Sequence, residues 1–189
     1  SALAAVLALP ACDSAPPPPG DALAPNTFTV RVGDAPEQTR AEAHFGTYVS
    51  EASGNTFAVV LGARPISAPL SLAAPAVGFA YDGVAVSTGT YPLEAVNPDG
   101  EPPKEAFIGV YIDPAQTTGG TPGRAGFYYS GEGAVTLDSL LADRARGTFS
   151  MTAVELDADS QPTGAEVAVT GAFHAVRTDV FGDEDAFWR

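Results

Sequence analysis

Apolar and polar residues alternate one by one along much of this chain. Phe28, Val30 and Val32 alternate with polar neighbours, and the same pattern runs through residues 165–176. Successive side chains of a strand point to opposite faces, so this alternation favours strands with one dry face and one wetter face. No long stretch repeats its apolar residues with the 3.6-residue period of a helix. The chain is therefore expected to fold through sheets.

Turn-forming clusters such as Ser53-Gly54-Asn55 and Asn97-Pro98-Asp99-Gly100 separate the alternating segments. Strands are predicted at residues 27–32, 40–45, 56–61, 68–72, 77–81, 89–95, 106–112, 125–130, 133–138, 146–156 and 165–176. The best helical candidate is one turn around Ser139–Arg144. The predicted fold class is all-β: an antiparallel β-sandwich or a barrel-like sheet of roughly ten short strands, with little helix.

A glycine followed two positions later by an aromatic residue recurs in the chain. It occurs as Gly-Thr-Tyr at 46–48 and 89–91, as Gly-Thr-Phe at 147–149 and as Gly-Ala-Phe at 171–173. The spacings are unequal, which excludes a solenoid or propeller built on a constant period. We expect the glycine to allow a bend as a strand begins, and the aromatic ring to fill the core.

The first twelve residues combine an apolar run with the only cysteine of the chain. Residues 1–11 read SALAAVLALPA, which is shorter than the roughly 20 apolar residues of a membrane-spanning helix. The run has the length of the apolar part of a secretory signal peptide. Leu9-Pro10-Ala11-Cys12 then resembles the lipobox of bacterial lipoproteins. That resemblance implies lipidation of Cys12, with more than one acyl chain for stable anchoring. The alternative is a buried first helix that ends in a free thiol.

Four segments are predicted along the chain. Residues 1–12 are expected to be a truncated lipoprotein signal peptide with its lipobox cysteine. Residues 13–26, DSAPPPPGDALAPN, are a proline-rich linker that favours extended polyproline II and spans up to about 40 Å. Residues 27–180 form the β-sandwich domain, and residues 181–189 form an acidic and aromatic C-terminal tail.

The C-terminal part of the domain also carries a resemblance. Residues 133–176 contain a VTL strand, a GTF strand and a hairpin that ends in VTGAF. This pattern is similar to the C-terminal half of bacterial lipoproteins of unknown function. The resemblance implies a β-sandwich on a lipid anchor, located in the bacterial cell envelope on the periplasmic or cell-surface side. It implies no activity.

The charge balance limits the partners. Lys and Arg number 9 against 23 Asp and Glu, so the net charge is −14. Phosphate recognition needs clustered cations, so nucleic acid is not an expected partner. The expected partners are the membrane, through the anchor at Cys12, and a glycan or protein of the envelope. One cysteine excludes an internal disulfide framework.

Asp157 and Asp159 are the candidate metal ligands. Together with Gln161 they have the alternate spacing of a calcium loop, but Pro162 and Ala168 stand where an EF-hand needs glycine and glutamate. The spacing allows a weak, irregular calcium site at these two aspartates, and no other cofactor is predicted. The alternative is a solvated hairpin tip.

Sequence motifs for catalysis are missing. No G-x-S-x-G elbow occurs, and both His44 and His174 are predicted to be surface residues. Tyr128 is the candidate ligand-binding residue. If its neighbours Phe127 and Tyr129 face the core, its ring is exposed and can stack on a sugar or a peptide.

The prediction for function is a lipid-anchored, extracytoplasmic, non-enzymatic module for binding or envelope interaction. One alternative is a structural or accessory subunit of a cell-surface complex. A glycan hydrolase that uses two carboxylates about 5–10 Å apart is ranked last. The irregular loops at 97–105 and 114–124 are further places where a sandwich could bind a ligand.

Overall fold

The structure is a computed structural model that describes residues 23–50, 54–62, 75–82, 86–95, 105–113, 126–157 and 161–178. Within these ranges the chain forms ten strands in one sheet and no helix, which confirms the predicted all-β fold. The strands are β1 (Thr27–Val32), β2 (Gln38–Ala41), β3 (Ala43–Ser50), β4 (Gly54–Leu61), β5 (Ala76–Asp82), β6 (Gly89–Leu93), β7 (Phe107–Ile112), β8 (Phe127–Leu140), β9 (Arg144–Leu156) and β10 (Pro162–Arg177).

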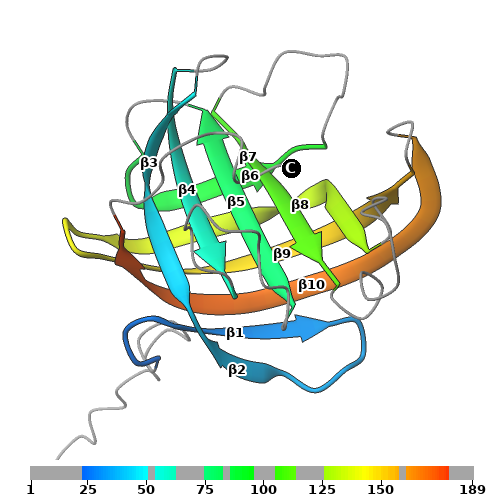
Figure 1. Ribbon diagram of the computed structural model, residues 1–189, viewed down its shortest axis with the longest axis horizontal. Coiled ribbons are helices and arrows are strands. Elements are labelled where there is room, and N and C mark those ends of the chain that lie inside the picture. Colours follow the sequence, from blue (N-terminus) through cyan, green and yellow to red (C-terminus); the bar gives the residue numbers. More distant parts are fainter. Residues whose placement is uncertain are drawn as a thin grey trace, which may run out of the picture.

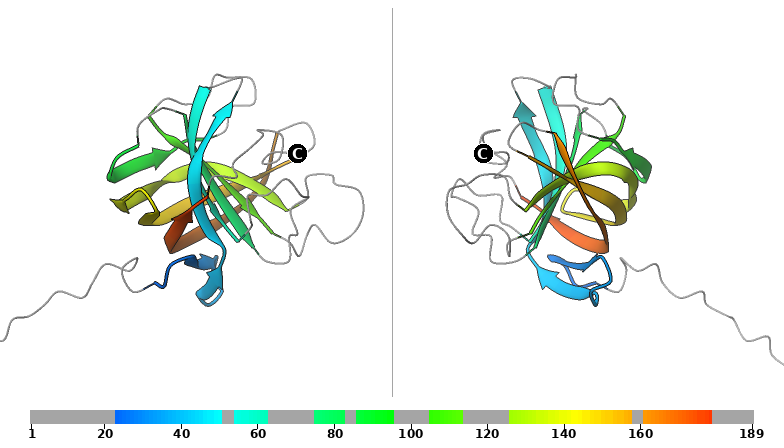
Figure 2. Two further views of the ribbon diagram at one scale, coloured as in Figure 1. Left: turned by 60° about the vertical axis from the view of Figure 1, so that its left-hand side comes forward. Right: turned by 90° about the vertical axis from the view of Figure 1, so that its right-hand side faces the viewer.

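The sheet closes on itself. Pairing runs from β10 through β3, β4, β5, β7, β8 and β9 and returns to β10 (Figure 1). Every pairing is antiparallel except two short parallel ones, β3 with β10 and β6 with β7. Figures 1 and 2 show β3, β4 and β5 crossing β9 and β10 at a steep angle, with the β1–β2 hairpin outside this closed part. Of the two predicted arrangements, a sandwich or a barrel-like sheet, the barrel-like sheet describes this structure, because one continuous sheet supplies both layers.

The long strands β8 and β10 each change partners part of the way along. Near its start β8 pairs with β7, and from Gly133 to Leu137 it pairs with β6. Between these parts, the pairing of β8 with β9 shifts register from Ser130 to Glu132. The buried Ser130 hydroxyl donates to the carbonyl oxygen of Glu94 at 2.6 Å and accepts from Gly109 N–H at 3.0 Å. A bulge of this kind bends the strand and increases its twist.

Side chains from alternate positions fill the interior of the closed sheet. On β9, Phe149, Met151 and Ala153 are buried while Ser150 between them is exposed, as the alternation predicted. Of the described residues, the largest fully buried side chains are those of Phe28, Phe79, Phe107 and Phe173. Burial of large aromatic and aliphatic side chains is the main stabilising contribution in a fold of this size.

Several predicted boundaries are wrong. The strand at 40–45 is interrupted at Glu42, whose φ of 70° is left-handed, so the chain forms β2 and β3 instead. The strands at 125–130 and 133–138 are one strand, β8, bent at its bulge.

The helical turn at Ser139–Arg144 is also wrong. Leu141 N–H donates to the Arg144 carbonyl oxygen at 2.8 Å, which closes the tight turn between β8 and β9. The predicted strand at 68–72 lies outside the described residues. The predicted loops at 97–105 and 114–124 lie outside them except for Glu105.

Candidate functional site

A pocket of about 190 Å³ opens at the end of the closed sheet where the β8–β9 turn meets the start of β3 and the end of β10. Most of its lining is apolar. The lining residues are Phe45, Gly46, Thr47, Phe57, Val86, Leu140, Leu141 and Arg177. The volume lies below the roughly 300–1,000 Å³ of most small-molecule sites, so a fitting ligand is small.

Aromatic rings form the inner part of the pocket. Phe45 on β3 and Phe57 on β4 are both buried, with ring centroids 6.1 Å apart. Phe57 in turn contacts Phe107 edge-on at 6.2 Å. At the outer end of the pocket, the Leu141 side chain is 50% exposed. Among the described residues it is the large hydrophobic side chain that is exposed to solvent. The pocket therefore leads from an apolar rim to the edge of the core.

Arg177 is the charged side chain in the lining. Its backbone N–H donates to the Asp143 carbonyl oxygen at 3.0 Å, and its guanidinium donates a long bond of 3.5 Å to the Ala142 carbonyl oxygen. These contacts hold the end of β10 against the β8–β9 turn. A guanidinium beside an apolar pocket suits a ligand that combines an apolar body with a carboxylate or another anionic group.

His174 lies on β10 three residues before Arg177, and it is buried with 2% of its surface exposed. Its Nδ1–H donates to the Leu23 carbonyl oxygen at 2.9 Å, and its Nε2 accepts from Arg146 Nε–H at 3.4 Å. Because Arg146 donates to Nε2, the ring nitrogen that donates to Leu23 is Nδ1. The prediction of a surface histidine is wrong here because the segment before β1 covers this face of β10, where Asn26 N–H donates to the His174 carbonyl oxygen at 2.8 Å.

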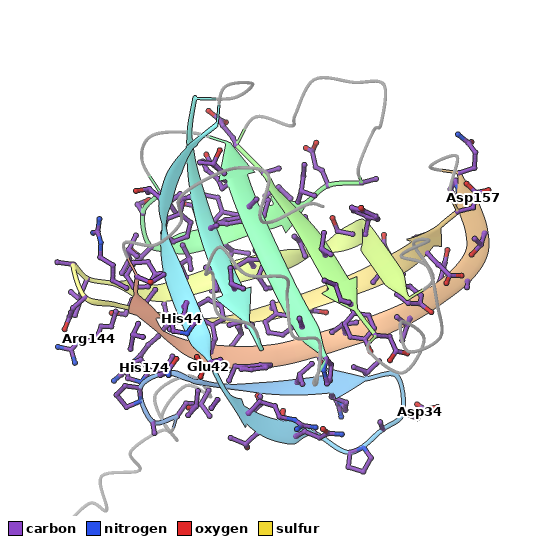
Figure 3. All side chains as sticks on the ribbon, in the orientation of Figure 1. Asp34, Glu42, His44, Arg144, Asp157 and His174 are labelled. Carbon is purple, nitrogen blue, oxygen red and sulfur yellow. The ribbon has the colours of Figure 1, made fainter. Side chains whose placement is uncertain are left out.

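His44 and Glu42 form a second polar pair at the same end of the molecule, as Figure 3 shows. The His44 Nε2 atom lies 2.8 Å from Glu42 Oε2, and the His44 side chain is 14% exposed. His44 is therefore partly buried, and the prediction of a surface histidine holds for it only in part. The Nδ1 atom of His44 is buried and has no hydrogen-bond partner among the described residues. With Nε2–H donated to the carboxylate and Nδ1 enclosed, the ring has no nitrogen open to a substrate.

Two residues with left-handed backbone hold this corner in place. Asn26 has a φ of 62° and Glu42 a φ of 70°. The Asn26 side-chain oxygen accepts from Ala43 N–H at 2.9 Å, and the Glu42 carbonyl oxygen accepts from Gly62 N–H at 2.8 Å. The strain at these positions accompanies the sharp step from β2, on the outer hairpin, to β3, in the closed sheet.

Tyr128 does not present its ring to solvent. It is 7% exposed, and its ring lies 5.6 Å from that of Tyr111. The prediction of an exposed stacking residue is therefore wrong. Burial, with smaller contributions from Asp113 and Tyr128, raises the pKa of Tyr111 to about 12. The Tyr111–Tyr128 pair belongs to the core.

The predicted calcium ligands are only partly described. Asp157 is exposed, and its Oδ1 atom accepts from Gln161 N–H at 2.9 Å while its own N–H donates to the Gln161 carbonyl oxygen at 2.9 Å. One carboxylate oxygen therefore caps the β9–β10 turn. Asp159 lies outside the described residues, as do Cys12 and the tail at 181–189. In the part of the chain that is described, no three His, Cys, Asp or Glu side chains gather as a metal site.

No sequence motif indicated the pocket, because its lining comes from five separate stretches of the chain. The available signal was the pair Leu140-Leu141 next to the polar turn at Asp143-Arg144. Comparisons with protein-family models, curated proteins and solved structures find no match to this chain. Among the described residues, no helix is long and apolar enough to cross a membrane.

Proposed function

We propose that this protein is a lipid-anchored, extracytoplasmic binding module of the bacterial cell envelope, and that its pocket takes a small amphipathic anion. The observation that carries the proposal is the position of Arg177 on the rim of a pocket otherwise lined mainly by Phe45, Phe57, Leu140 and Leu141. The apolar lining accounts for binding of a hydrocarbon or aromatic body, and the guanidinium accounts for the anionic group.

The lipid anchor is supported by the sequence around Cys12, where the lipobox-like residues precede a proline-rich linker. Mass spectrometry of the native N-terminus tests this part of the proposal. A diacylglyceryl cysteine at Cys12 is the expected result. An unmodified thiol with residues 1–11 retained would remove the anchor, and with it the assignment to the envelope.

Binding can be measured with octanoate as the probe, because it joins an eight-carbon chain to one carboxylate. Titration of the full chain, followed by the NMR signals of Leu140 and Leu141, is expected to show saturable binding. Arg177→Gln should weaken octanoate binding by at least about tenfold, because a hydrogen bond to a charged group contributes about 1.5–3 kcal/mol. Octanol should bind the parent protein and the variant equally.

The matched control is Arg31→Gln, which removes an exposed arginine on β1 outside the pocket lining. It should leave octanoate binding unchanged. If both variants weakened octanoate binding equally, the overall charge of the protein would explain the loss, and Arg177 would have no specific role in binding. Absence of saturable shifts at Leu140 and Leu141 would reject the pocket as the binding site.

A structural or accessory subunit is the second candidate, and β2 favours it. All four residues of β2 are exposed, and its neighbour in the described sheet is β1 alone, so one edge is open for pairing with another strand. Crosslinking in native envelopes tests this role. A lone monomer without crosslinked partners would count against it.

The carboxylate-dependent hydrolase stays the third candidate. Among the described residues, the pocket lining contains no Asp or Glu that could form the acid pair of glycoside hydrolysis. Its supporting result would be release of reducing sugar from envelope glycans.

A further inference from the structure

The Gly-Thr-Tyr segment at 89–91 opens β6, and its tyrosine reaches back to the chain before the strand. The Tyr91 hydroxyl donates to the Ser87 carbonyl oxygen at 2.9 Å and accepts from Ser87 N–H at 3.0 Å. The Ser87 hydroxyl lies 3.3 Å from the same phenol oxygen. Gly89, between the two residues, has a φ of 152°, which side chains other than glycine rarely allow. One phenol group therefore holds both backbone polar groups of an exposed residue.

The Tyr91 ring is itself fixed by two aromatic neighbours. It meets the rings of Tyr81 and Phe107 edge-on, and the ring centroids are 5.4 Å apart in both pairs. Phe107 also contacts Phe57, which lines the pocket. Edge-to-face contacts at these distances are favourable. The phenol is therefore attached to the same aromatic cluster that forms the inner part of the pocket.

Val86, the residue before Ser87, lines the pocket. The β6–β8 pairing places Gly89 opposite Leu137, so the residues before Gly89 run toward Leu140, which also lines the pocket. The side chains of Val86 and Leu140 are both partly buried and pack against the core. The segment that Tyr91 holds therefore supplies part of the pocket wall.

Strand pairing does not fix Val86. The described residues 86–88 precede β6 and belong to no strand. The Tyr91 hydroxyl instead binds the backbone of Ser87, directly after Val86. The phenol thus holds this segment in the way that a partner strand holds the backbone of its neighbour.

We infer that Tyr91 is a positioning residue for the pocket, because its hydroxyl holds Val86 in the wall through Ser87. Tyr91 itself is not among the described lining residues. For ligand binding, the inference rests on the proposed function. A wall that is held before binding loses less conformational freedom when a ligand enters. Without the hydroxyl, the segment before Gly89 gains freedom, and a bound ligand loses part of its apolar contact with Val86.

A double-mutant cycle on the full chain tests the inference, with octanoate as the probe. Tyr91→Phe keeps the ring but removes the hydroxyl, and it should weaken octanoate binding about threefold. Val86→Ala removes most of the wall side chain and should weaken octanoate binding about fivefold. The variant with both changes should bind octanoate about as weakly as Val86→Ala alone, because the hydroxyl acts by holding Val86.

Thr90→Ala is the matched control. The Thr90 hydroxyl lies 3.0 Å from that of Thr136 on β8, so this change also removes a hydrogen bond of β6 but leaves Ser87 untouched. It should leave octanoate binding unchanged. Unchanged binding by Tyr91→Phe, or losses that multiply in the double variant, would overturn the inference. Equal weakening by Tyr91→Phe and Thr90→Ala would also overturn it, because a general loosening of β6 would then explain the effect.

A second measurement needs no ligand. In the free protein, the NMR order parameter of the Val86 backbone amide should fall from about 0.85 toward about 0.6 in Tyr91→Phe and stay at the parent value in Thr90→Ala. Equal order parameters in Tyr91→Phe and the parent protein would overturn the inference. If octanoate does not bind the parent protein, the proposed ligand is wrong, and the order parameter alone decides whether Tyr91 holds the wall. The two failures are therefore distinguishable.

Discussion

Phe173 on β10 lies directly opposite Gly147 on β9, and its ring occupies the space into which a β-carbon on Gly147 would project, at 2.8 Å. The reciprocal pair is Phe149 opposite Gly171, where the same distance is 2.7 Å. The two Gly-x-Phe segments therefore pair with each other, each glycine receiving the ring of the other strand. This reciprocal pairing explains why the motif occurs twice in the long hairpin.

Gly147→Ala is expected to destabilise the protein by at least about 1–3 kcal/mol, because overpacking forces neighbours out of place. An added β-carbon would lie 2.0 Å from the Thr136 carbonyl oxygen as well as against the Phe173 ring, and backbone cannot easily move aside. Urea unfolding measures the change. Thr148→Ala, at the next position, is the control and should change stability by no more than about 0.5 kcal/mol. Equal stability of Gly147→Ala and the parent protein would contradict the close packing.

Ser130→Ala tests the bulge of β8. It removes the hydroxyl that accepts from Gly109 N–H and donates to the Glu94 carbonyl oxygen, leaving two polar backbone groups without this partner. We expect a loss of about 1–3 kcal/mol in the free energy of unfolding, measured by chemical denaturation. Ser150→Ala, on the exposed face of β9, should have almost no effect. If Ser150→Ala lowered the free energy of unfolding as much as Ser130→Ala, the two hydrogen bonds of the Ser130 hydroxyl would not account for the loss.

Tyr111 is predicted to make the folded protein less stable at alkaline pH. Its folded-state pKa of about 12 lies above the value of 10.0 for an unperturbed tyrosine, so the folded state holds the phenol proton more tightly. Its contribution to stability is complete below pH 10 and falls as the pH rises from 10 through 12, by about 3 kcal/mol in total. Denaturation curves at pH 9, 10 and 11 should show this decline. Tyr111→Phe should show a smaller decline, and identical slopes would contradict the shifted pKa.

Alternation predicted most of the strands because it records which residues face the interior. It failed at Tyr128, for a local reason. Before the bulge at Ser130 the even-numbered residues of β8 face inward, and after it Val135 and Leu137 do so. The inserted residue changes which face each later side chain occupies, and nothing in the sequence marks that change except Gly131 and Gly133.

The candidate pocket could not be predicted from the sequence, for a different reason. Arg177, Leu141 and Phe57 are far apart in the chain. The pairing of β9 with β8 and β10 brings Leu141 to Arg177, and the pairing of β10 with β3 brings Arg177 to the side of the sheet that holds Phe57. The burial of His174 likewise depends on Leu23, about 150 residues earlier in the sequence. Local patterns specify a strand and its faces, but they do not specify which distant segment covers an outer face.

His174 is predicted to fix the point at which the N-terminal segment joins the domain. Gln at this position can still accept from Arg146 but loses the donor to the Leu23 carbonyl oxygen, whereas Asn can keep a donor near the Nδ1 position. His174→Gln should therefore speed hydrogen exchange at Asn26 up to about tenfold, since a neutral hydrogen bond contributes about 0.5–1.5 kcal/mol. His174→Asn should speed it less, and exchange in β4 should report any general loss of stability. If Asn26 exchanged equally in both variants, the bond from His174 to Leu23 would not be what holds this segment against β10.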